Sequence, residues 1–187
     1  MNAPLKLPAV RLDPGELFIG TRPTEVNTVL GSCVSVTIFH PRSRQGAINH
    51  GRRPEQTCAQ PNTGLKVCRE LGDYVDGSLE FMLAWFDRNG VSRKELEVKL
   101  FGGGMMFNLE KGKQSNIISV GKRNVDVAMQ FIRKNHLHLT SSDVGGPWGR
   151  VIVFNTATGE VKLKRVRKTV TDMENLSNIG VDAGAGR

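Results

Sequence analysis

The sequence has no long apolar run and few cysteines. Its longest uninterrupted apolar segment, Phe81–Phe86, is far shorter than the ~20 residues of a membrane-spanning helix, and the N-terminus lacks the apolar core and cleavage site of a signal peptide. The three cysteines, Cys33, Cys58 and Cys68, are too few and too widely spaced for a disulfide framework. No Cys-x-x-Cys pair and no His/Cys cluster has zinc spacing. We therefore expect a reduced cytoplasmic protein without membrane insertion, metal ion or other cofactor.

Acidic residues are in deficit, with 18 against 26 lysines and arginines, which gives a net charge of +8. Such a charge attracts nucleic acid, anionic lipid or an acidic protein surface alike. The basic residues gather in one expected strand, at Lys162, Lys164, Arg165, Arg167 and Lys168. A nucleic-acid surface would add interleaved aromatic residues, so an RNA-binding function would depend on charge alone. The strand is either a solvated sheet edge or a docking patch for a protein.

The length of 187 residues favours one domain. We expect a flexible N-terminus over residues 1–12, a single domain over 13–168 and a disordered polar, glycine-rich tail over 169–187. The segment Gly51–Asp76 is polar, contains both spare cysteines and reads as one long loop. Loops of this length inside a domain are usually functional or mobile.

Hydrophobic periodicity predicts mostly strands, with two helices inserted midway. The expected strands are Leu17–Gly20, Ser32–Phe39, Gln45–His50, Glu97–Phe101, Asn116–Val120, His136–Leu139, Arg150–Phe154 and Val161–Val166. The expected helices are Ser78–Asp87, with Ser78 as its cap and Asn89-Gly90 as its stop, and Asn124–Arg133, with one further turn opened by Ser92–Glu95. Short turns between successive strands favour antiparallel pairing, so the fold class is α+β.

The main candidate for chemistry is Cys33, at the head of the strand that follows Gly31 and Ser32. A Gly-Ser turn lets backbone N–H groups point at one spot, which is what a nucleophilic thiol needs beside it. Hairpin pairing would bring His50, at the end of the next strand, close to Cys33 as a base. The alternative is that Cys33 is a small core residue, since free cysteines are often buried.

Other candidates are weaker. His40 lies roughly 23 Å along the same strand from Cys33, at ~3.3 Å per residue, which is too far for the two to pair. His136 and His138 are expected at the surface. Gly102–Gly104 lacks the Lys-Ser/Thr ending of a phosphate-binding loop, so it more simply marks a tight bend near a ligand.

Six segments resemble the CheD family, the chemoreceptor glutamine deamidases, and they occur in family order over residues 15–166. They are Asn27–Val36, Gly46–His50, Lys99–Phe107, Ile118–Asn124, Asp143–Arg150 and Thr158–Lys162. The resemblance implies a layered α/β/β fold with mainly antiparallel sheets. It also implies an enzyme that converts glutamines of methyl-accepting chemoreceptors to glutamates and releases ammonia.

The resemblance assigns roles to particular residues. Cys33, as thiolate, would attack the side-chain carboxamide, and His50 would accept the thiol proton, pass one to ammonia and later activate water. The backbone N–H groups of Cys33 and its neighbour Ser32 would hold the oxyanion. An imidazolium beside the sulfur would hold the pKa of Cys33 well below its usual ~8.5.

The third catalytic residue of the family is a threonine that orients the histidine, commonly six positions before the cysteine. Here Asn27 occupies that position and Thr28 follows it. Both side chains carry an acceptor, so Thr28 is named with Asn27 as its rival. The implied partners are the cytoplasmic domains of the receptors and, in some bacteria, the chemotaxis phosphatase CheC. The alternative function is a receptor- or phosphatase-binding module that has kept the fold and lost the chemistry.

Overall fold

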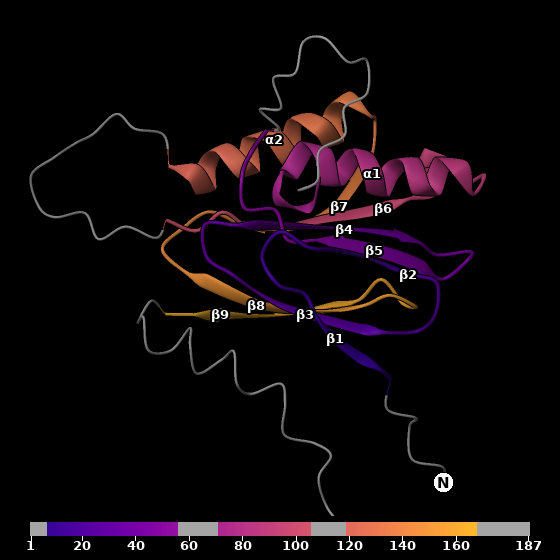
Figure 1. Cartoon of the computed structure of the whole chain (residues 1–187), viewed down its shortest axis with the longest axis horizontal. Coiled ribbons are helices and arrows are strands. Elements are labelled where there is room, and N and C mark those ends of the chain that lie inside the picture. The colour runs from indigo at the N-terminus through magenta and orange to yellow at the C-terminus, as the bar shows by residue number, and fades with distance from the viewer. Residues whose placement is uncertain (1–6, 56–70, 106–118, 168–187) are drawn as a thin grey trace, which may run out of the picture.

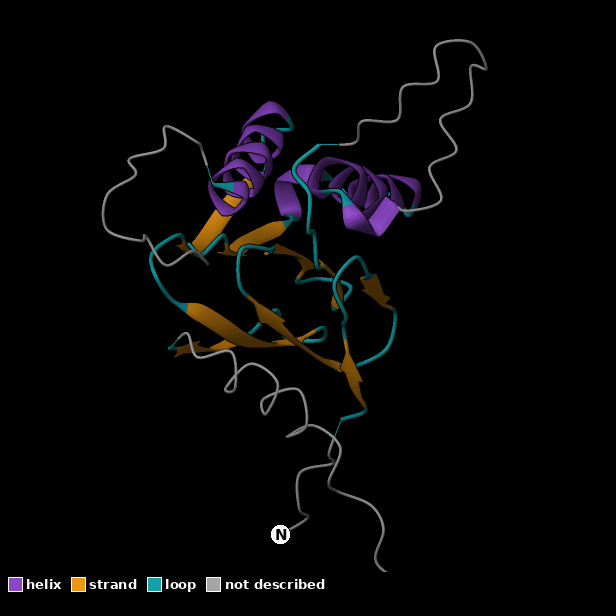
Figure 2. Ribbon diagram, turned by 60° about the vertical axis from the view of Figure 1, so that its left-hand side comes forward, coloured by secondary structure: helices purple, strands orange, loops and turns teal. Residues whose placement is uncertain are grey.

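A computed structural model describes residues 7–55, 71–105 and 119–167 of the chain. These residues form three layers: two helices cover one face of a five-stranded sheet, and the other face of that sheet packs on a four-stranded sheet (Figure 1, Figure 2). The predicted α+β class with an α/β/β layering is confirmed. None of the described helices is long and apolar enough to cross a membrane.

The five-stranded sheet has the order β2-β5-β4-β6-β7. Its strands are β2 (Leu17–Gly20), β4 (Val34–His40), β5 (Gln45–Asn49), β6 (Glu97–Gly102) and β7 (His138–Val144). All neighbours are antiparallel except β6 and β7. The central strand β4 is buried along its whole length, because one face meets the helices and the other meets the second sheet. The predicted strand at His136 begins two residues later, since His136 has a φ of 53°, which a strand does not accommodate.

The four-stranded sheet has the order β1-β3-β8-β9. Its strands are β1 (Ala9–Arg11), β3 (Glu25–Leu30), β8 (Gly149–Asn155) and β9 (Val161–Val166). The predicted β8–β9 hairpin is confirmed. The sequence did not predict β3 or β1, which lies within the N-terminal segment 1–12 and pairs in parallel with β3.

The helical segments are η1 (Leu71–Asp73), α1 (Val75–Arg88), η2 (Arg93–Glu95) and α2 (Val120–Lys134). Helix α1 ends at Asn89 before Gly90, as predicted, but Ser78 does not cap it. Ser78 is buried inside the helix, where its hydroxyl bonds Val75 O and receives the amide of Asn49. Helix α2 begins four residues earlier than expected because Ser119 caps it.

Several predictions fall wholly or partly outside the described residues. They concern the tail over 169–187, most of the loop Gly51–Asp76 with Cys58 and Cys68, and residues 116–118 of the strand expected at Asn116–Val120. For the last two residues of that strand the prediction is wrong, since they open α2. The loop also ends earlier than predicted, because α1 starts at Val75.

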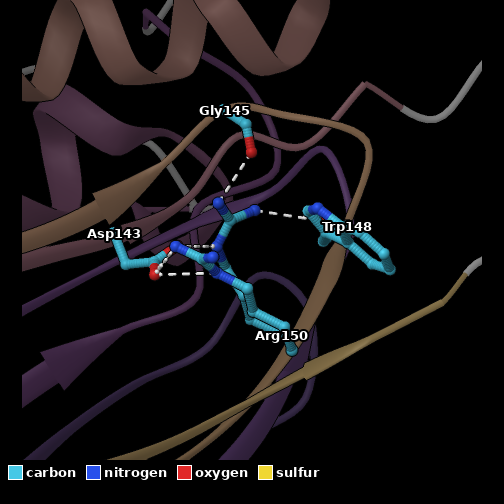
Figure 3. Close-up of polar contacts among 5 residues, drawn as sticks. Asp143, Gly145, Trp148 and Arg150 are labelled. Atoms are coloured by element: carbon cyan, nitrogen blue, oxygen red, sulfur yellow. Dashed lines mark hydrogen bonds and ion pairs between the residues drawn. The ribbon is translucent and has the colours of Figure 1, made fainter.

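Arg150 is fully buried between the sheets and holds the loop that joins β7 to β8 (Figure 3). Its Nε donates to Asp143 Oδ1 at 2.7 Å, while its two terminal nitrogens donate to the carbonyl oxygens of Trp148, at 2.9 Å, and Gly145, at 2.6 Å. The other oxygen of Asp143 pairs with the exposed Arg165 at 2.7 Å. The Arg150 guanidinium therefore donates to three oxygen atoms, one of a carboxylate and two of backbone carbonyls, that have no partner from β-sheet pairing.

Arg150→Met should lower the free energy of unfolding by ~3–5 kcal/mol, because it leaves part of a buried ion pair and two carbonyls without their donor. Arg165→Met removes an exposed partner of the same carboxylate and should cost under ~1 kcal/mol. Urea denaturation of both variants measures the two losses. Equal losses would contradict the organising role of Arg150.

Candidate active site

Cys33 lies directly before β4, at the end where β4 meets the chain that follows β5. Val34 and Gly51 exchange two backbone hydrogen bonds, of 3.0 and 2.9 Å. They keep the register in which Thr37 of β4 opposes Ile48 of β5. This register sets His50 opposite Ser35, on the same face as Cys33. Diagonal neighbours in a regular ladder are about 7–8 Å apart, so the register places Cys33 and His50 on one face of the sheet as diagonal neighbours.

His50 is held by its backbone and fully buried. Its N–H donates to Glu16 O at 2.8 Å, and its carbonyl accepts from Gly15 N at 2.8 Å. The preceding Asn49 inserts its side chain into the ladder, where Oδ1 accepts the Val36 N–H at 2.7 Å. The imidazole is 1% exposed. The imidazole therefore has little freedom to rotate toward other hydrogen-bond partners.

Thr28 fixes the proton on that ring. Its hydroxyl donates to Leu12 O at 2.7 Å and lies 2.7 Å from His50 Nδ1. A hydroxyl has one hydrogen, and Leu12 O receives it. With the hydroxyl hydrogen on Leu12 O, Thr28 Oγ1 accepts from Nδ1–H in the tautomer that leaves Nε2 with a bare lone pair. Among the described residues Nε2 has no hydrogen-bond partner.

Asn27 is not brought to His50. Residues of β3 alternate between the buried face, with Thr28, and the outer face, with Asn27. The rival to Thr28 therefore lies on the wrong side of its strand to contact the imidazole.

The turn before β4 presents two backbone donors. The carbonyl oxygens of Gly31, Ser32 and Cys33 all accept hydrogen bonds, from Gly104 N at 2.8 Å, Asn124 Nδ2 at 3.1 Å and Gly103 N at 2.8 Å. The N–H groups of Ser32 and Cys33 find no acceptor in another described residue. Two unpaired N–H groups at a nucleophile are the arrangement that stabilises a tetrahedral oxyanion.

The glycine run Gly102–Gly104 forms the predicted tight bend. Gly102 has a φ of 108°, and a Cβ there would lie 2.2 Å from Cys33 O. Any side chain would push this bend away from the Cys33 turn. The run thus lets backbone meet backbone beside the thiol, and it is not a phosphate loop.

Burial sets the charge state of the two central groups. It lowers the pKa of His50 to about 4, although the Leu12 backbone and the Asp13 and Glu16 carboxylates favour the charged ring. It raises the pKa of the Cys33 thiol above its ordinary value, against the opposing effects of Arg52 and of the Cys33 N–H. The expected thiolate–imidazolium pair is therefore wrong for the free protein. Both pKa shifts favour the neutral forms, a thiol at Cys33 and an uncharged imidazole at His50.

The remaining histidines lie elsewhere. His40 is at the far end of β4, where Nδ1 contacts Ser43 Oγ at 2.7 Å, and His136 and His138 are exposed at the start of β7. Within the described ranges, no group of three or more His, Cys, Asp and Glu side chains could hold a metal ion.

Sequence reasoning missed two residues around Cys33. Arg52 forms a two-pronged ion pair with Asp73, at 2.7 and 2.6 Å, and its charge acts on the thiol. Asn124 reaches the Cys33 turn from α2. The segment Ile118–Asn124 was noticed only as part of a resemblance, and no spacing in the sequence links it to Cys33.

Comparison with known proteins gives one consistent result. The sequence model of the CheD family, described as CheD chemotactic sensory transduction, matches residues 60–165. This range includes the glycine bend, Asn124 and Arg150 but begins after Thr28, Cys33 and His50.

Curated relatives extend the match toward the N-terminus. A "probable chemoreceptor glutamine deamidase CheD 2" of Geobacter sulfurreducens is 44% identical over 167 residues, covering 89% of this chain and 96% of the relative. A "probable chemoreceptor glutamine deamidase CheD" of Maridesulfovibrio salexigens is 39% identical, covering 85% and 92%. An alignment of 167 residues in a chain of 187 spans the segment from Thr28 to His50.

The buried imidazole predicts a loss of stability in mild acid. Between pH 6.5 and about 4 the unfolded chain binds a proton at His50 that the folded protein does not. Stability therefore falls as the pH falls through this window and is unaffected by His50 above it. Between pH 7.5 and 4.5, the wild type should lose about 2–3 kcal/mol more than His50→Gln.

Chemical denaturation at the two pH values measures this difference. His138→Gln is the control, because this exposed histidine should leave the wild-type loss unchanged. If His50→Gln loses as much stability as the wild type, His50 is not held neutral by burial.

Proposed function

Since this chain belongs to the CheD family, we propose that it is a chemoreceptor glutamine deamidase, which converts specific glutamine side chains of methyl-accepting chemoreceptors to glutamate. The observation that carries the proposal is the His50 ring, with Nδ1 held by Thr28 and Nε2 unpartnered among the described residues. The ring lies diagonally across the hairpin from Cys33. The substrate would be the cytoplasmic domain of the receptor, so the enzyme would work in the cytoplasm.

Cys33 is the proposed nucleophile of a cysteine hydrolase. As its sulfur bonds to the carboxamide carbon, His50 Nε2 takes the thiol proton and the amide oxygen becomes an oxyanion held by the Ser32 and Cys33 N–H groups. The C–N bond then breaks, and the imidazolium gives its proton to the nitrogen that leaves as ammonia. Water, losing a proton to Nε2, attacks the γ-glutamyl thioester. The C–S bond breaks, which releases glutamate and restores the thiol.

The charge states favour proton transfer in step with attack. Because burial raises the pKa of Cys33 and lowers that of His50, a free thiolate is costly before substrate arrives. Formation of the C–S bond moves the negative charge from sulfur to oxygen, where two N–H groups receive it. Activation of the thiol thus depends on the bound carboxamide.

The alternative, a binding module without chemistry, leaves the polar groups of the site unexplained. An unpaired buried polar atom costs about 1–3 kcal/mol. His50 Nε2 is such an atom, and a module that only binds a receptor or phosphatase gains nothing from it. Binding of a CheC-type phosphatase to the enzyme stays a separate prediction.

The basic strand β9 is proposed as the docking patch for the receptor. Lys162, Lys164 and Arg167 are exposed, and Arg167 lies over the Trp148 ring, 5.8 Å from its centroid. The strand runs toward the Cys33 end of the sheets, since Arg165 pairs with Arg150 and Arg150 with Leu30. Acid-rich receptor helices would be attracted over a Debye length of ~8 Å.

Cys33→Ala should abolish ammonia release from receptor cytoplasmic fragments while the fold persists, because the substitution removes little more than a sulfur atom. Cys58→Ser and Cys68→Ser are the matched controls and should keep nearly full turnover. Mass spectrometry of the target glutamine, which gains about one dalton on deamidation, gives the same readout at the substrate. Turnover near wild type in Cys33→Ala would refute the assignment of the nucleophile.

Thr28→Val should lower kcat by about 10–100-fold, as is typical when the partner that orients a functional imidazole is lost. Valine keeps the shape but cannot accept Nδ1–H, so the ring loses its fixed tautomer. Asn27→Ala, on the outer face, should stay within about twofold of the wild type. Steady-state kinetics measure both values of kcat. A larger loss in Asn27→Ala than in Thr28→Val would assign the orientation of His50 to Asn27.

Reversing Lys162, Lys164 and Arg167 to glutamate should raise KM at low salt and flatten its salt dependence, with kcat unchanged, because exposed charges act on encounter. Reversal of Arg88, Arg133 and Lys134, exposed on the helix layer, controls for net charge. An equal rise of KM in both triple variants would show that β9 is only a solvated sheet edge and does not dock the receptor.

A further inference from the structure

Asn124 is a fully buried polar residue in the second turn of α2. Its amide nitrogen donates to two backbone carbonyls, Ser32 O at 3.1 Å and Arg52 O at 3.0 Å. Its Oδ1 has no partner among the described residues. Asparagine is a poor helix former compared with alanine, and an unpaired buried oxygen adds a further cost. Helix stability therefore does not account for this side chain.

The contact with Ser32 sets the direction of an amide that the reaction needs. Ser32 C=O and Cys33 N–H belong to one peptide group, which is planar and trans, so the two bonds point in opposite directions. The Asn124 amide holds Ser32 O on the helix side. The Cys33 N–H must then point the other way, and it does act on its own sulfur, since it favours the charged form of the thiol.

The neighbouring peptide is held differently. Gly31 O accepts from the backbone N–H of Gly104 at 2.8 Å, which by the same geometry aims the Ser32 N–H. One oxyanion donor is thus oriented by backbone alone and the other by a side chain. The first turn of α2 also packs closely on the glycine bend, because a Cβ at Gly121 would lie 2.7 Å from Gly103 O.

We propose that Asn124 is a positioning residue that aims the Cys33 N–H at the oxyanion of the acyl-transfer step. This inference rests on the proposed deamidase function and extends it to a residue of the helix layer. The second contact, to Arg52 O, ties the chain just beyond His50 to the same amide. The nucleophile turn and the segment that carries the base therefore share one anchor.

The test compares two reactions of Cys33 in the same variants. Asn124→Ala should lower kcat for deamidation of a receptor fragment at least tenfold, toward the ~10²–10³-fold loss typical of a missing oxyanion donor. KM should stay within about threefold, because substrate contacts are unchanged. The plateau rate of Cys33 alkylation by iodoacetamide at high pH, where the thiol is ionised in every variant, should stay within about twofold, because displacement at a saturated carbon needs the thiolate but forms no oxyanion.

Asn124→Leu, which keeps a similar volume without the donors, should show the same selective loss and replaces the alanine variant if that does not fold. Ser119→Ala is the control: it removes the cap of α2 and leaves the Asn124 contacts, so kcat should hold.

The inference is overturned by a kcat within twofold of wild type in a folded Asn124 variant. Equal losses of alkylation and deamidation also overturn it, because they indicate a merely structural role. If the wild type itself releases no ammonia from the receptor fragment, the proposed function falls first and the inference falls with it. If the wild type and the Asn124 variant are both active, the proposed function stands and only the role of Asn124 is refuted.

Discussion

The hydrogen-bond pattern around His50 depends on the single hydrogen of the Thr28 hydroxyl. Because Leu12 O receives it, Thr28 accepts from His50 Nδ1, and the lone pair of the imidazole is left on Nε2. This arrangement requires both sheets, since Thr28 belongs to β3 in one sheet and His50 follows β5 in the other. Packing the two sheets face to face therefore brings Thr28 to the imidazole of His50, which is the proposed base, on the face of the sheet that also carries Cys33, the proposed nucleophile.

Burial of the same groups creates a resting state without charge. The raised pKa of the Cys33 thiol and the lowered pKa of His50 favour the uncharged forms. Partial burial would also strengthen the interaction of the Ser32 and Cys33 N–H groups with an oxyanion, because a lower dielectric strengthens hydrogen bonds. The surrounding carbonyls are all engaged by Gly103, Gly104 and Asn124. In the proposed mechanism, the N–H groups left over at this turn would meet the charge that develops during the reaction.

The sequence predicted what depends on local pairing. The strand with Val34, Val36 and Ile38 and its short return sufficed to place Cys33 and His50 on one face of the sheet. The choice between Thr28 and Asn27 could not be made, because it depends on which face of an unpredicted strand meets the other sheet. Asn124 and Ser32 are 92 residues apart in the sequence. Only the packing of α2 on the glycine bend brings the two residues together. The charge states were mispredicted because burial opposes the ion pair.

The central claim is that substrate is carried on the Cys33 sulfur as a γ-glutamyl thioester. The wild-type protein would be mixed with a receptor cytoplasmic fragment, quenched in acid and digested for mass spectrometry, with a parallel reaction containing hydroxylamine. The account predicts a Cys33 peptide joined to the target glutamine peptide with loss of one ammonia, and a hydroxamate at that glutamine when hydroxylamine intercepts the thioester. Formation of glutamate at the normal rate with neither adduct nor hydroxamate would contradict it.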